Sequence, residues 1–501
     1  MPDNRPNVLF VMADQQRHDT IRALGNDLIF TPALDRLAAR GVAFTNAYST
    51  CPVCVPARYT IRTGCEPPTV GCYQNAAPKG VEGQAPDVED RCGPFLGKRM
   101  SQLGYRTWGI GKFHSMHPDL GYETLYRAEE MWGPEERAKD AFAGFIAREH
   151  PEFSFIEQLH GERTEMYYMP QTSPLPRHLT YESWAADRAC ELLGVDDGRP
   201  FFGFVSFIRP HPPLAPPIPF NRMYDPDRMP DPVLGDLAVD HADEQIPWMN
   251  YAIWAEDIAA PHARVLRARY YASVTWVDWN LGRILDALEQ RPDARNTIVC
   301  YFSDHGDHLG DHHAWQKESF FEASCRVPFL VSWPERLPAG TRRDDLVCLT
   351  DLFGLATGAA RQEESREGIS LLRLLAGESR GRPHLVGYYG DPGTPLFKVM
   401  VRQGEWKYIF LANGGRELLF NVAQDPQELH SQVKQQPQVA LRLRRLALAA
   451  LRRPNADRAL EEGDLRAFPF RPRPLQRIYQ MDYSRGVHGF PKRPQDVLEQ
   501  L

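Results

Sequence analysis

A cysteine, a proline and an arginine at fixed spacing form the most chemically suggestive segment of the sequence. Residues 54–58 read Cys-Val-Pro-Ala-Arg. Pro56 fits the first turn of a short helix and Gly64 fits its C-terminal stop. We therefore expect Cys54 at a helix N-terminus, where free N–H groups and the helix dipole favour an anion. Arg58 adds a fixed cation one turn later, so the pattern predicts a nucleophile, a positive helix end and a guanidinium around one oxyanion.

This segment resembles the signature of the type I sulfatases of the alkaline-phosphatase superfamily, Cys-x-Pro-x-Arg with a Thr-Gly ten residues on. The resemblance implies that Cys54 is oxidised to formylglycine by a formylglycine-generating enzyme, and that the hydrated aldehyde is the nucleophile. The alternative is that Cys51 and Cys54 form a redox or zinc half-site. The sequence has no second Cys-x-x-Cys and no thioredoxin-like context, which disfavours that alternative.

Two acidic positions match the metal-binding pairs of the same family. Asp14 directly follows one strand-like run, and Asp304-His305 follow another in Ser-Asp-His-Gly. The family usually has a second Asp after the first, whereas this chain has Gln15. Open α/β sheets bind ligands at the C-terminal ends of their strands, so we expect these side chains to meet. The resemblance implies one divalent cation bound by Asp14, Gln15, Asp304, His305 and residue Cys54; the oxygen-rich set favours Ca²⁺, with Mg²⁺ or Mn²⁺ as alternatives.

Four basic side chains follow the order of the family motifs. Lys112 and His114 stand in Gly-Lys-Phe-His, His211 stands in Pro-His-Pro-Pro, and Lys317 lies twelve residues after His305. The resemblance implies that Lys112 and Lys317 bind sulfate oxygens. It also implies that His211 contacts the sulfate near the leaving oxygen and that His114 assists proton transfer at the hydrated aldehyde.

These motifs predict a sulfuric ester hydrolase that acts on a small-molecule or saccharide sulfate ester. The matches run from residue 7 to about 330, with a weaker echo at 419–426. A phosphonate monoester or phosphodiester hydrolase of the same superfamily is the alternative. Gln15 favours that alternative, because it removes a negative ligand, while the pair Lys112 and His114 favours the sulfatase. A non-enzymatic anion binder, in which Cys54 stays a thiol, is disfavoured because every expected polar position is filled.

Three other segments admit more than one interpretation. The run 307–313, Asp-His-Leu-Gly-Asp-His-His, fits no closed zinc pattern, and we favour loop residues at the pocket mouth over a second metal site. Residues 73–75, Tyr-Gln-Asn, are candidate pocket contacts. Residues 276–279, Trp-Val-Asp-Trp, are expected to pack in a helix, and Met116-His117 are either pocket wall or plain loop.

Short apolar runs alternate with helical patterns, as expected for a mostly parallel sheet sandwiched by helices in an alkaline-phosphatase-like α/β fold. Thr31 is the expected N-cap of a helix over 31–40, and apolar residues at steps of three and four predict a long helix over 266–288. The expected strands cover residues 8–13, 105–110, 201–207, 297–302 and 329–332.

The pattern changes near residue 380. Short β-like pieces at 398–402, 406–410 and 417–420, separated by Gly and Asn turns, predict a small antiparallel sheet, and a helix is expected at about 436–452. We therefore predict a catalytic domain over 1–380, an α+β subdomain over 381–460 and an extended arm over 461–501 that could support a homo-oligomer.

Composition and charge narrow the function classes. Of 501 residues, 25% are charged and the net charge is −7, which excludes a generally basic nucleic-acid binder. The longest apolar runs are strand-sized, and the N-terminus lacks a signal-peptide pattern, so we expect no membrane partner and a cytoplasmic location. The odd count of nine cysteines argues against a disulfide scaffold.

Overall fold

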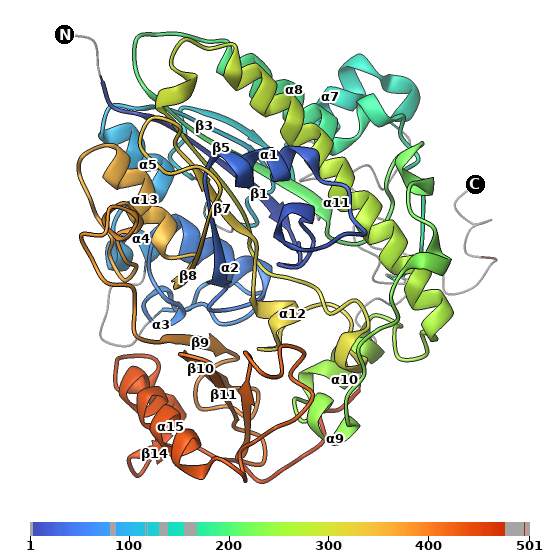
Figure 1. Cartoon of the computed structure of the whole chain (residues 1–501), viewed down its shortest axis with the longest axis vertical. Helices are drawn as coiled ribbons and strands as arrows, with labels where there is room; N and C mark the ends of the chain where they lie inside the picture. Colours follow the sequence, from blue (N-terminus) through green and yellow to red (C-terminus); the bar gives the residue numbers. More distant parts are fainter. Residues whose placement is uncertain are drawn as a thin grey trace.

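An eight-stranded sheet runs through the larger part of the molecule (Figure 1). The computed structural model describes residues 4–80, 87–115, 117, 119–129, 139–154, 168–475 and 495. The strands lie in the order β4 (Thr124–Arg127), β3 (Arg106–Gly111), β5 (Phe201–Pro210), β1 (Asn7–Asp14), β6 (Thr297–Ser303), β7 (Phe329–Ser332), β2 (Val42–Tyr48) and β8 (Thr341–Cys348). β7 runs antiparallel to both neighbours and the other pairings are parallel, which confirms the predicted fold class.

The sequence patterns found the strands at the centre of the sheet and missed three near its edges. β1, β5 and β6 are buried along their whole length and stand out as continuous apolar runs. β8 is an edge strand that begins Thr-Arg-Arg-Asp-Asp, and β4 is a short edge strand whose residues are all half-buried. β2 is buried at both ends but carries Thr-Asn at its centre. These three strands were not predicted because polar or half-buried residues interrupt the apolar pattern that marks the central strands.

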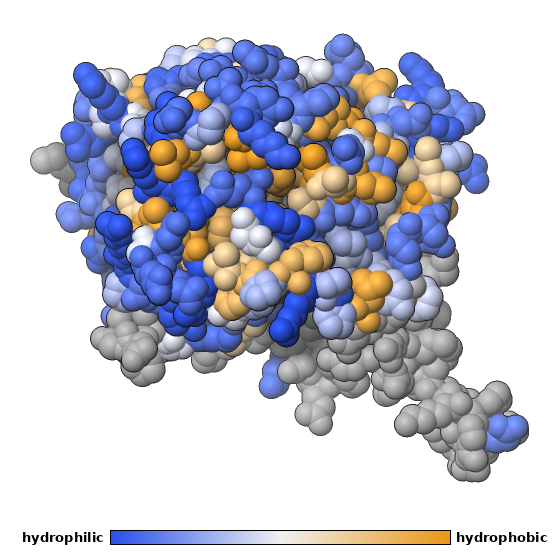
Figure 2. Space-filling view, turned by 90° about the horizontal axis from the view of Figure 1, so that it is seen from below, coloured by the Kyte–Doolittle hydropathy of each residue, from blue (hydrophilic) through white to orange (hydrophobic). Residues whose placement is uncertain are grey.

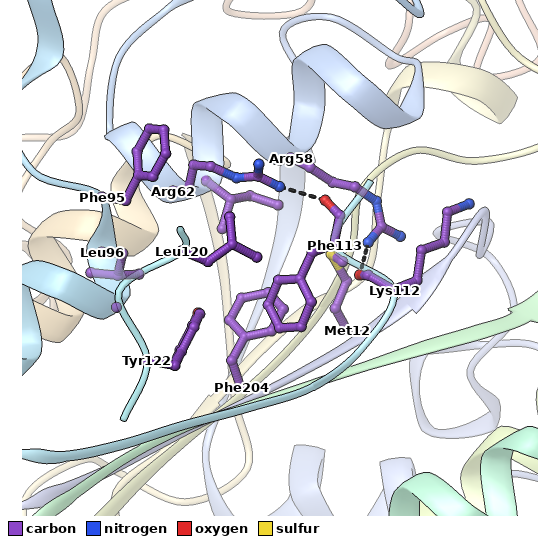
Figure 3. Close-up of a pocket in the computed structure, with 12 residues that line it drawn as sticks. Met12, Arg58, Arg62, Phe95, Leu96, Lys112, Phe113, Leu120, Tyr122 and Phe204 are labelled. Carbon is purple, nitrogen blue, oxygen red and sulfur yellow. Dashed lines mark hydrogen bonds between the residues drawn. The ribbon is translucent and has the colours of Figure 1, made fainter. Parts of the chain in front are cut away.

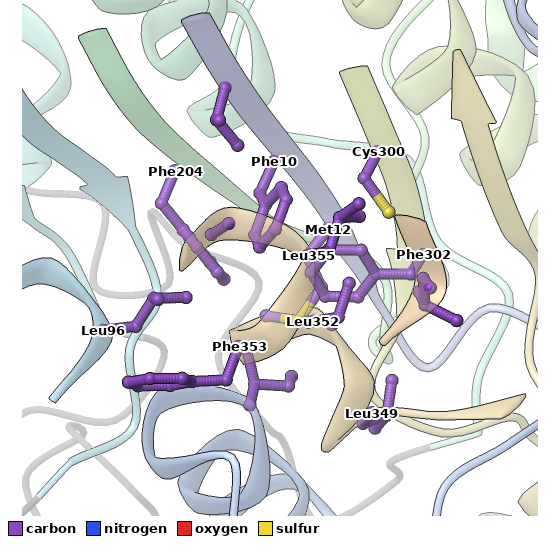
Figure 4. Close-up of a cluster of buried hydrophobic side chains, with 14 of the residues drawn as sticks. Phe10, Met12, Leu96, Phe204, Cys300, Phe302, Leu349, Leu352, Phe353 and Leu355 are labelled. Atoms are coloured by element: carbon purple, nitrogen blue, oxygen red, sulfur yellow. The ribbon is translucent and has the colours of Figure 1, made fainter. Parts of the chain in front are cut away.

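β1 supplies alternate side chains to the two cores that flank the sheet. Phe10 and Met12 point to one core, where Phe10 packs edge-on against Phe302 with ring centroids 5.8 Å apart (Figure 4). Leu9 and Val11 point to the opposite core. Both cores pack on the strand that ends in Asp14, so they fix the position of the first acidic residue of the site.

Helices cover both faces of this sheet (Figure 1). The first core is covered by α2 (Cys54–Thr63), α5 (Leu96–Gln102) and α13 (Asp351–Ala359), and the second by α1 (Pro32–Arg40), α7 (Ala141–Glu149), α8 (Tyr181–Leu193) and α11 (Ala260–Glu289). The shorter helices are α3 (Pro67–Val70), α4 (Val88–Cys92), α9 (Leu237–Asp240), α10 (Gln245–Ala252), α12 (Glu322–Cys325) and α14 (Leu371–Leu375). Short 3₁₀ turns occupy Arg22–Leu24, Pro151–Phe153, Arg177–Leu179, Phe220–Arg222, Pro226–Arg228, Ala294–Asn296, Asp311–His313 and Asp457–Ala459.

Thr31 occupies the N-cap position of α1, as predicted, but its side chain does not cap the helix. The N-terminus of α1 is capped by a residue of another helix. The Asp278 carboxylate of α11 accepts hydrogen bonds from the backbone N–H groups of Ala33, at 3.0 Å, and Leu34, at 2.7 Å, and no side-chain cap is formed by Thr31. A residue distant in sequence thus supplies the acceptor that a local Thr usually provides. The prediction that residues 276–279 pack in a helix holds only in part: Trp276 is buried, whereas Trp279 is 54% exposed.

The C-terminal part contains the predicted antiparallel sheet. Its order is β12 (Arg416–Asn421), β11 (Trp406–Leu411), β10 (Lys398–Gln403) and β9 (Leu385–Tyr389), followed by α15 (Pro437–Leu451) and the two-residue strands β13 (Leu460–Glu461) and β14 (Asp464–Leu465). One face of this four-stranded sheet packs against residues such as Val53 and Phe321, which lie in segments that connect strands of the large sheet. The other face packs on α15. The small sheet therefore supports the segment that precedes Cys54.

The described part of the C-terminal arm packs against other segments of the same chain. The backbone of Arg471 exchanges two hydrogen bonds with the side chain of Asn413, at 2.8 and 2.9 Å. The guanidinium of Arg473 stacks on the Trp248 ring, 3.5 Å from its centroid, and donates to Gln245. The predicted oligomer contact through this arm stays a prediction.

Seen from below, the molecule presents a mosaic of hydrophilic and hydrophobic residues, with apolar groups separated by charged ones (Figure 2). Exposed large apolar side chains include Leu234 and Leu237, each about half exposed. Within the described ranges, none of the helices combines the length and the apolarity that a bilayer crossing requires.

Candidate active site

Most of the residues predicted to form the site come from the C-terminal ends of four strands and from one helix, whereas Lys317 lies in a loop. β3, β5, β1 and β6 lie side by side and run parallel. Asp14 ends β1, Asp304 follows β6, His211 follows β5 and Lys112 follows β3, while Cys54 is the first residue of α2. The sheet thus brings these side chains to one edge, as the sequence predicts.

Helix α2 begins and ends where its sequence indicates. The Asn75 side chain accepts a hydrogen bond from the backbone N–H of Val55 at 3.0 Å and satisfies one free donor of the first turn. Gly64 adopts a left-handed φ of 65° and returns its N–H to the carbonyl of Thr60 at 2.8 Å. Every residue of α2 is buried, so Cys54 is held rigidly against the strand ends.

Four side chains form a compact set of potential metal ligands. The ligand atoms of Asp14, Cys54, Asp304 and His305 all lie within 4.8 Å of one another, and all four residues are buried. His305 Nε2 lies 3.6 Å from an Asp14 oxygen, 3.7 Å from an Asp304 oxygen and 3.1 Å from the Cys54 sulfur. Its Nδ1 lies 3.0 Å from the carbonyl of Gly306, and donation there leaves Nε2 as a ligand atom facing the set. Two carboxylates and one imidazole fit a hard divalent cation.

Arg58 clamps the two carboxylates of this set together. Its Nη2 donates to Asp14 at 2.8 Å and its Nε donates to Asp304 at 2.9 Å, while Nη1 donates to the Lys112 carbonyl and to Ser206 Oγ. Burial disfavours the charged guanidinium, but Asp304 and Asp14 outweigh it and raise the pKa of Arg58. The buried Arg58 cation is thus bound to both acids of the pair.

Lys112 bridges the acidic pair and the nucleophile position. Its Nζ lies 2.5 Å from an Asp14 oxygen and 4.0 Å from the Cys54 sulfur, and the side chain is fully buried. Burial alone would raise the pKa of Asp14, but Lys112 and other cations lower it, so this carboxyl is held ionised. Burial and the charge of Asp14 raise the pKa of Asp304. Asp14 therefore gives up its proton more readily than Asp304.

Lys317, Gln15 and His211 form a second group of contacting side chains. Lys317 Nζ donates to the Gln15 amide oxygen at 2.6 Å and lies 3.3 Å from His211 Nε2. His211 Nδ1 lies 2.8 Å from the carbonyl of Pro212. The structure therefore brings Lys317 and His211 together, as predicted. Gln15 links this group to Asp304, because the Asp304 carboxylate accepts a hydrogen bond from the Gln15 backbone N–H at 3.2 Å.

The electrostatics favour an anion at residue 54. Burial raises the pKa of the Cys54 thiol, but the charges of Lys112, Lys317 and His305 lower it well below its ordinary value. A negative nucleophile or a bound anion is stabilised by the same charges.

Glu129 holds the loop that carries His114, and sequence reasoning missed it. His114 adopts a left-handed φ of 48°, and its backbone N–H lies 2.9 Å from each Glu129 carboxylate oxygen. Glu129 also accepts from the backbone N–H of Phe113, at 3.2 Å, and from Arg127, at 2.9 Å. No motif surrounds Glu129 in the sequence, so only its position after β4 could have suggested a role.

The alternative Cys-x-x-Cys site is not formed. The Cys51 sulfur lies 3.5 Å from the carbonyl of Tyr73, whereas the Cys54 sulfur faces His305. Burial and neighbouring Cys72 raise the pKa of Cys51. The two thiols therefore face different partners and have opposite electrostatic surroundings.

The run 307–313 forms a buried polar loop beside the site. Among the described residues, Asp14, Cys54, Asp304 and His305 are the one group of three or more potential ligands whose donor atoms converge, and this run does not join it. Asp311 is paired with Arg17 and Arg267. Asp307 accepts from Gln15 Nε2 and from the Tyr168 hydroxyl, both at 2.6 Å. These contacts favour the interpretation of residues 307–313 as loop residues over a second metal site.

The remaining candidates do not belong to the donor set and have structural contacts instead. Tyr73 belongs to the core under α15, and Asn75 serves as the cap of α2. His117 packs edge-on against Phe95, with ring centroids 5.0 Å apart, as a loop residue. Met116 lies outside the described residues.

A narrow cavity lies behind Arg58 and Lys112 (Figure 3). Its volume is about 20 Å³, and it is lined mainly by apolar side chains such as Phe95, Tyr122 and Phe204. Arg58 donates to the Lys112 carbonyl at its edge. A space of this size suits about one water molecule, so it is not a substrate pocket.

Comparison with known proteins agrees with the geometry. The family model described as Sulfatase matches residues 6–360, and the model of the C-terminal part of N-sulphoglucosamine sulphohydrolase matches residues 310–451. The chain belongs to the sulfatase family. It is therefore a hydrolase, as the sequence predicts, and the resemblance carried by the Cys54 motif is confirmed.

Individual relatives align with most of this sulfatase. An arylsulfatase from Clostridium perfringens (strain 13 / Type A) is 28% identical over 444 residues, covering 85% of this chain and 89% of that one. A choline-sulfatase from Rhizobium meliloti (strain 1021) is 28% identical over 458 residues, covering 86% and 82%. The crystal structure of a phosphonate monoester hydrolase from Agrobacterium radiobacter has a TM-score of 0.75 at 24% identity, covering 89% and 95%, and shares the fold.

Proposed function

We propose that this sulfatase cleaves sulfate monoesters through a formylglycine formed from Cys54 and with the help of one divalent cation. The observation that carries the proposal is the position of Cys54, whose sulfur lies 3.1 Å from His305, 3.9 Å from Asp14 and 4.0 Å from the Lys112 ammonium. A small-molecule or saccharide sulfate ester would place its anionic group among these charges.

The donor set supports a Ca²⁺ or Mg²⁺ site. Asp14, Asp304 and His305 would hold the ion together with residue 54, and the Gln15 amide oxygen is a further candidate ligand. A bound divalent cation supplies a Lewis acid for a sulfate oxygen and favours ionisation of a hydroxyl beside it.

Four basic residues would bind the sulfate group and transfer protons. Lys112 and Lys317 both provide fixed positive charge that acts on residue 54, and they would bind the sulfate oxygens. Lys317 and His211 lie 3.3 Å apart and could deliver a proton to the leaving oxygen. His114, whose side chain contributes to lowering the pKa of Cys54, would take a proton from the hydroxyl there when sulfate is expelled.

Phosphonate monoester or phosphodiester hydrolysis is the second candidate function, and Gln15 favours it. An amide in place of a carboxylate leaves the bound cation with more net positive charge. A more strongly positive site would suit a phosphonate or phosphate group.

Parallel rate measurements on an aryl sulfate and an aryl phosphonate monoester test the proposal. They require enzyme produced together with a formylglycine-generating enzyme. We expect the larger kcat/KM for the sulfate and loss of turnover in Cys54→Ala. Cys51→Ala is the matched control and should retain turnover, because its sulfur faces Tyr73. A larger kcat/KM for the phosphonate would establish the second candidate, and normal turnover by Cys54→Ala would refute both.

A further inference from the structure

A buried carboxylate outside the group of four converging donors stands next to Gln15. Asp307 is fully buried, and its side chain accepts three hydrogen bonds. Gln15 Nε2 and the Tyr168 hydroxyl donate to Oδ2 at 2.6 Å each, and the backbone N–H of Leu309 donates to Oδ1 at 2.9 Å. All three partners are donors, so the position requires an acceptor on both oxygens.

The Gln15 amide is fixed at both ends by charged groups. Its Oε1 accepts from the Lys317 ammonium at 2.6 Å, and its Nε2 donates to Asp307. A flipped amide would set its NH₂ against the ammonium and its oxygen against the carboxylate, which both groups oppose. Asp307 and Lys317 therefore select one orientation of this side chain.

Gln15 is also linked to the donor set through its backbone and through Lys317. The backbone N–H of Gln15 lies 3.2 Å from Asp304 Oδ1. Lys317, which touches the amide oxygen, also acts electrostatically on Cys54 and His305. The amide oxygen is thus bound to an ammonium whose charge reaches two members of the donor set. Gln15 itself has a left-handed φ of 66°, so its backbone is held there by these contacts.

We propose that Asp307 is a positioning residue that orients the Gln15 amide so that its oxygen, and not its NH₂ group, is presented to the divalent cation. The inference rests on the proposed function, because it assumes that a cation occupies the donor set. It gives a role to the first residue of the run 307–313, which neither a zinc pattern nor a general loop explains. Partners that orient metal ligands in this way typically contribute 10- to 100-fold to metal affinity.

Asp307→Asn tests the orientation directly. Because Gln15, Tyr168 and Leu309 all donate, an Asn amide at this position always sets its own NH₂ against a donor. We expect Ca²⁺ affinity, measured by isothermal titration calorimetry on the apo enzyme, to fall about 10- to 100-fold. Tyr168→Phe keeps the ring against Trp315, with centroids 4.9 Å apart, removes one hydroxyl, and should weaken binding about 2- to 10-fold. This milder variant keeps the test valid if Asp307→Asn does not fold.

A double-mutant cycle with Gln15→Ala separates positioning from general loop damage. If Asp307 acts through Gln15, then Asp307→Asn causes no further loss of Ca²⁺ affinity in the Gln15→Ala background. Asp311→Asn is the matched control from the same loop. Its carboxylate binds Arg17 and Arg267, so this variant should melt at a lower temperature and keep its Ca²⁺ affinity within about twofold of wild type.

The outcomes distinguish this inference from the proposed function. Wild-type Ca²⁺ affinity in Asp307→Asn, or additive losses in the cycle, would overturn the positioning role while leaving sulfate ester hydrolysis intact. Wild-type enzyme that cleaves an aryl sulfate but binds neither Ca²⁺ nor Mg²⁺ would overturn both the metal-dependent function and this inference.

Discussion

Replacing Arg58 by lysine tests whether geometry or charge alone holds the acidic pair. The Arg58 guanidinium donates to Asp14, Asp304, the Lys112 carbonyl and Ser206 from one rigid plane. A lysine keeps the positive charge but has a single nitrogen with three donors, so it cannot make all four contacts.

The expected loss follows from the contacts that a lysine forfeits. At least one contact disappears, and if it is a charge-assisted bond to a carboxylate the cost is about 1.5–3 kcal/mol. If a neutral contact is lost as well, the total is about 2–4 kcal/mol, which corresponds to about 30- to 1,000-fold in kcat/KM when the loss is felt in the transition state. Displaced Asp14 and Asp304 oxygens should also weaken metal binding.

Hydrolysis of an aryl sulfate and calorimetric Ca²⁺ titration of Arg58→Lys provide the assay. Arg62→Lys is the matched control, because Arg62 lies one turn later on α2, is buried, and donates to the Phe113 carbonyl without touching the acids. Arg62→Lys should lose stability but keep its Ca²⁺ affinity. Wild-type Ca²⁺ affinity and less than a threefold loss of kcat/KM in folded Arg58→Lys would refute the reasoning.

Three further outcomes are expected. Lys112→Ala should lower kcat on an aryl sulfate by about 100- to 1,000-fold, because the ammonium beside Asp14 is lost, and a loss below tenfold would exclude a contact with the reacting group. Glu129→Gln should lower kcat by about 10- to 100-fold with little change in KM, since one charged acceptor for the His114 loop is lost, and an unchanged kcat would contradict that role. Burial raises the pKa of Asp278 to about 7 in the folded protein, against about 3.9 unfolded, so its stabilising contribution is present below pH 4 and is lost as pH rises through 7. Urea unfolding should therefore give Asp278→Asn a larger deficit relative to wild type at pH 5 than at pH 8, and an equal or larger deficit at pH 8 would contradict the assignment.

The site residues could be predicted from the sequence where each lies at the end of an apolar strand. Asp14 and Asp304 directly follow buried runs, so their meeting at one sheet edge follows from parallel pairing alone. Cys54 and Gly64 mark the two ends of α2 through the chemistry of a helix start and a helix stop. These signals are local, and the fold preserves them.

Contacts between distant segments carry no such signal. Asp278 caps α1 from a helix more than two hundred residues later, and Thr31, the local candidate, does not cap it. Glu129 supports His114 through backbone N–H groups, which any sequence provides. The sequence also indicated Arg58 as a cation for the oxyanion, whereas its donors are occupied by Asp14, Asp304, a carbonyl and Ser206.

Peptide mass analysis of the mature enzyme tests the central claim most directly. Trypsin releases residues 41–58, which contain both Cys51 and Cys54. In protein that hydrolyses an aryl sulfate, we predict that residue 54 has exchanged one sulfur and two hydrogens for one oxygen, while Cys51, facing the Tyr73 carbonyl, is unchanged. Full hydrolytic activity from protein in which Cys54 is an intact thiol would contradict the account.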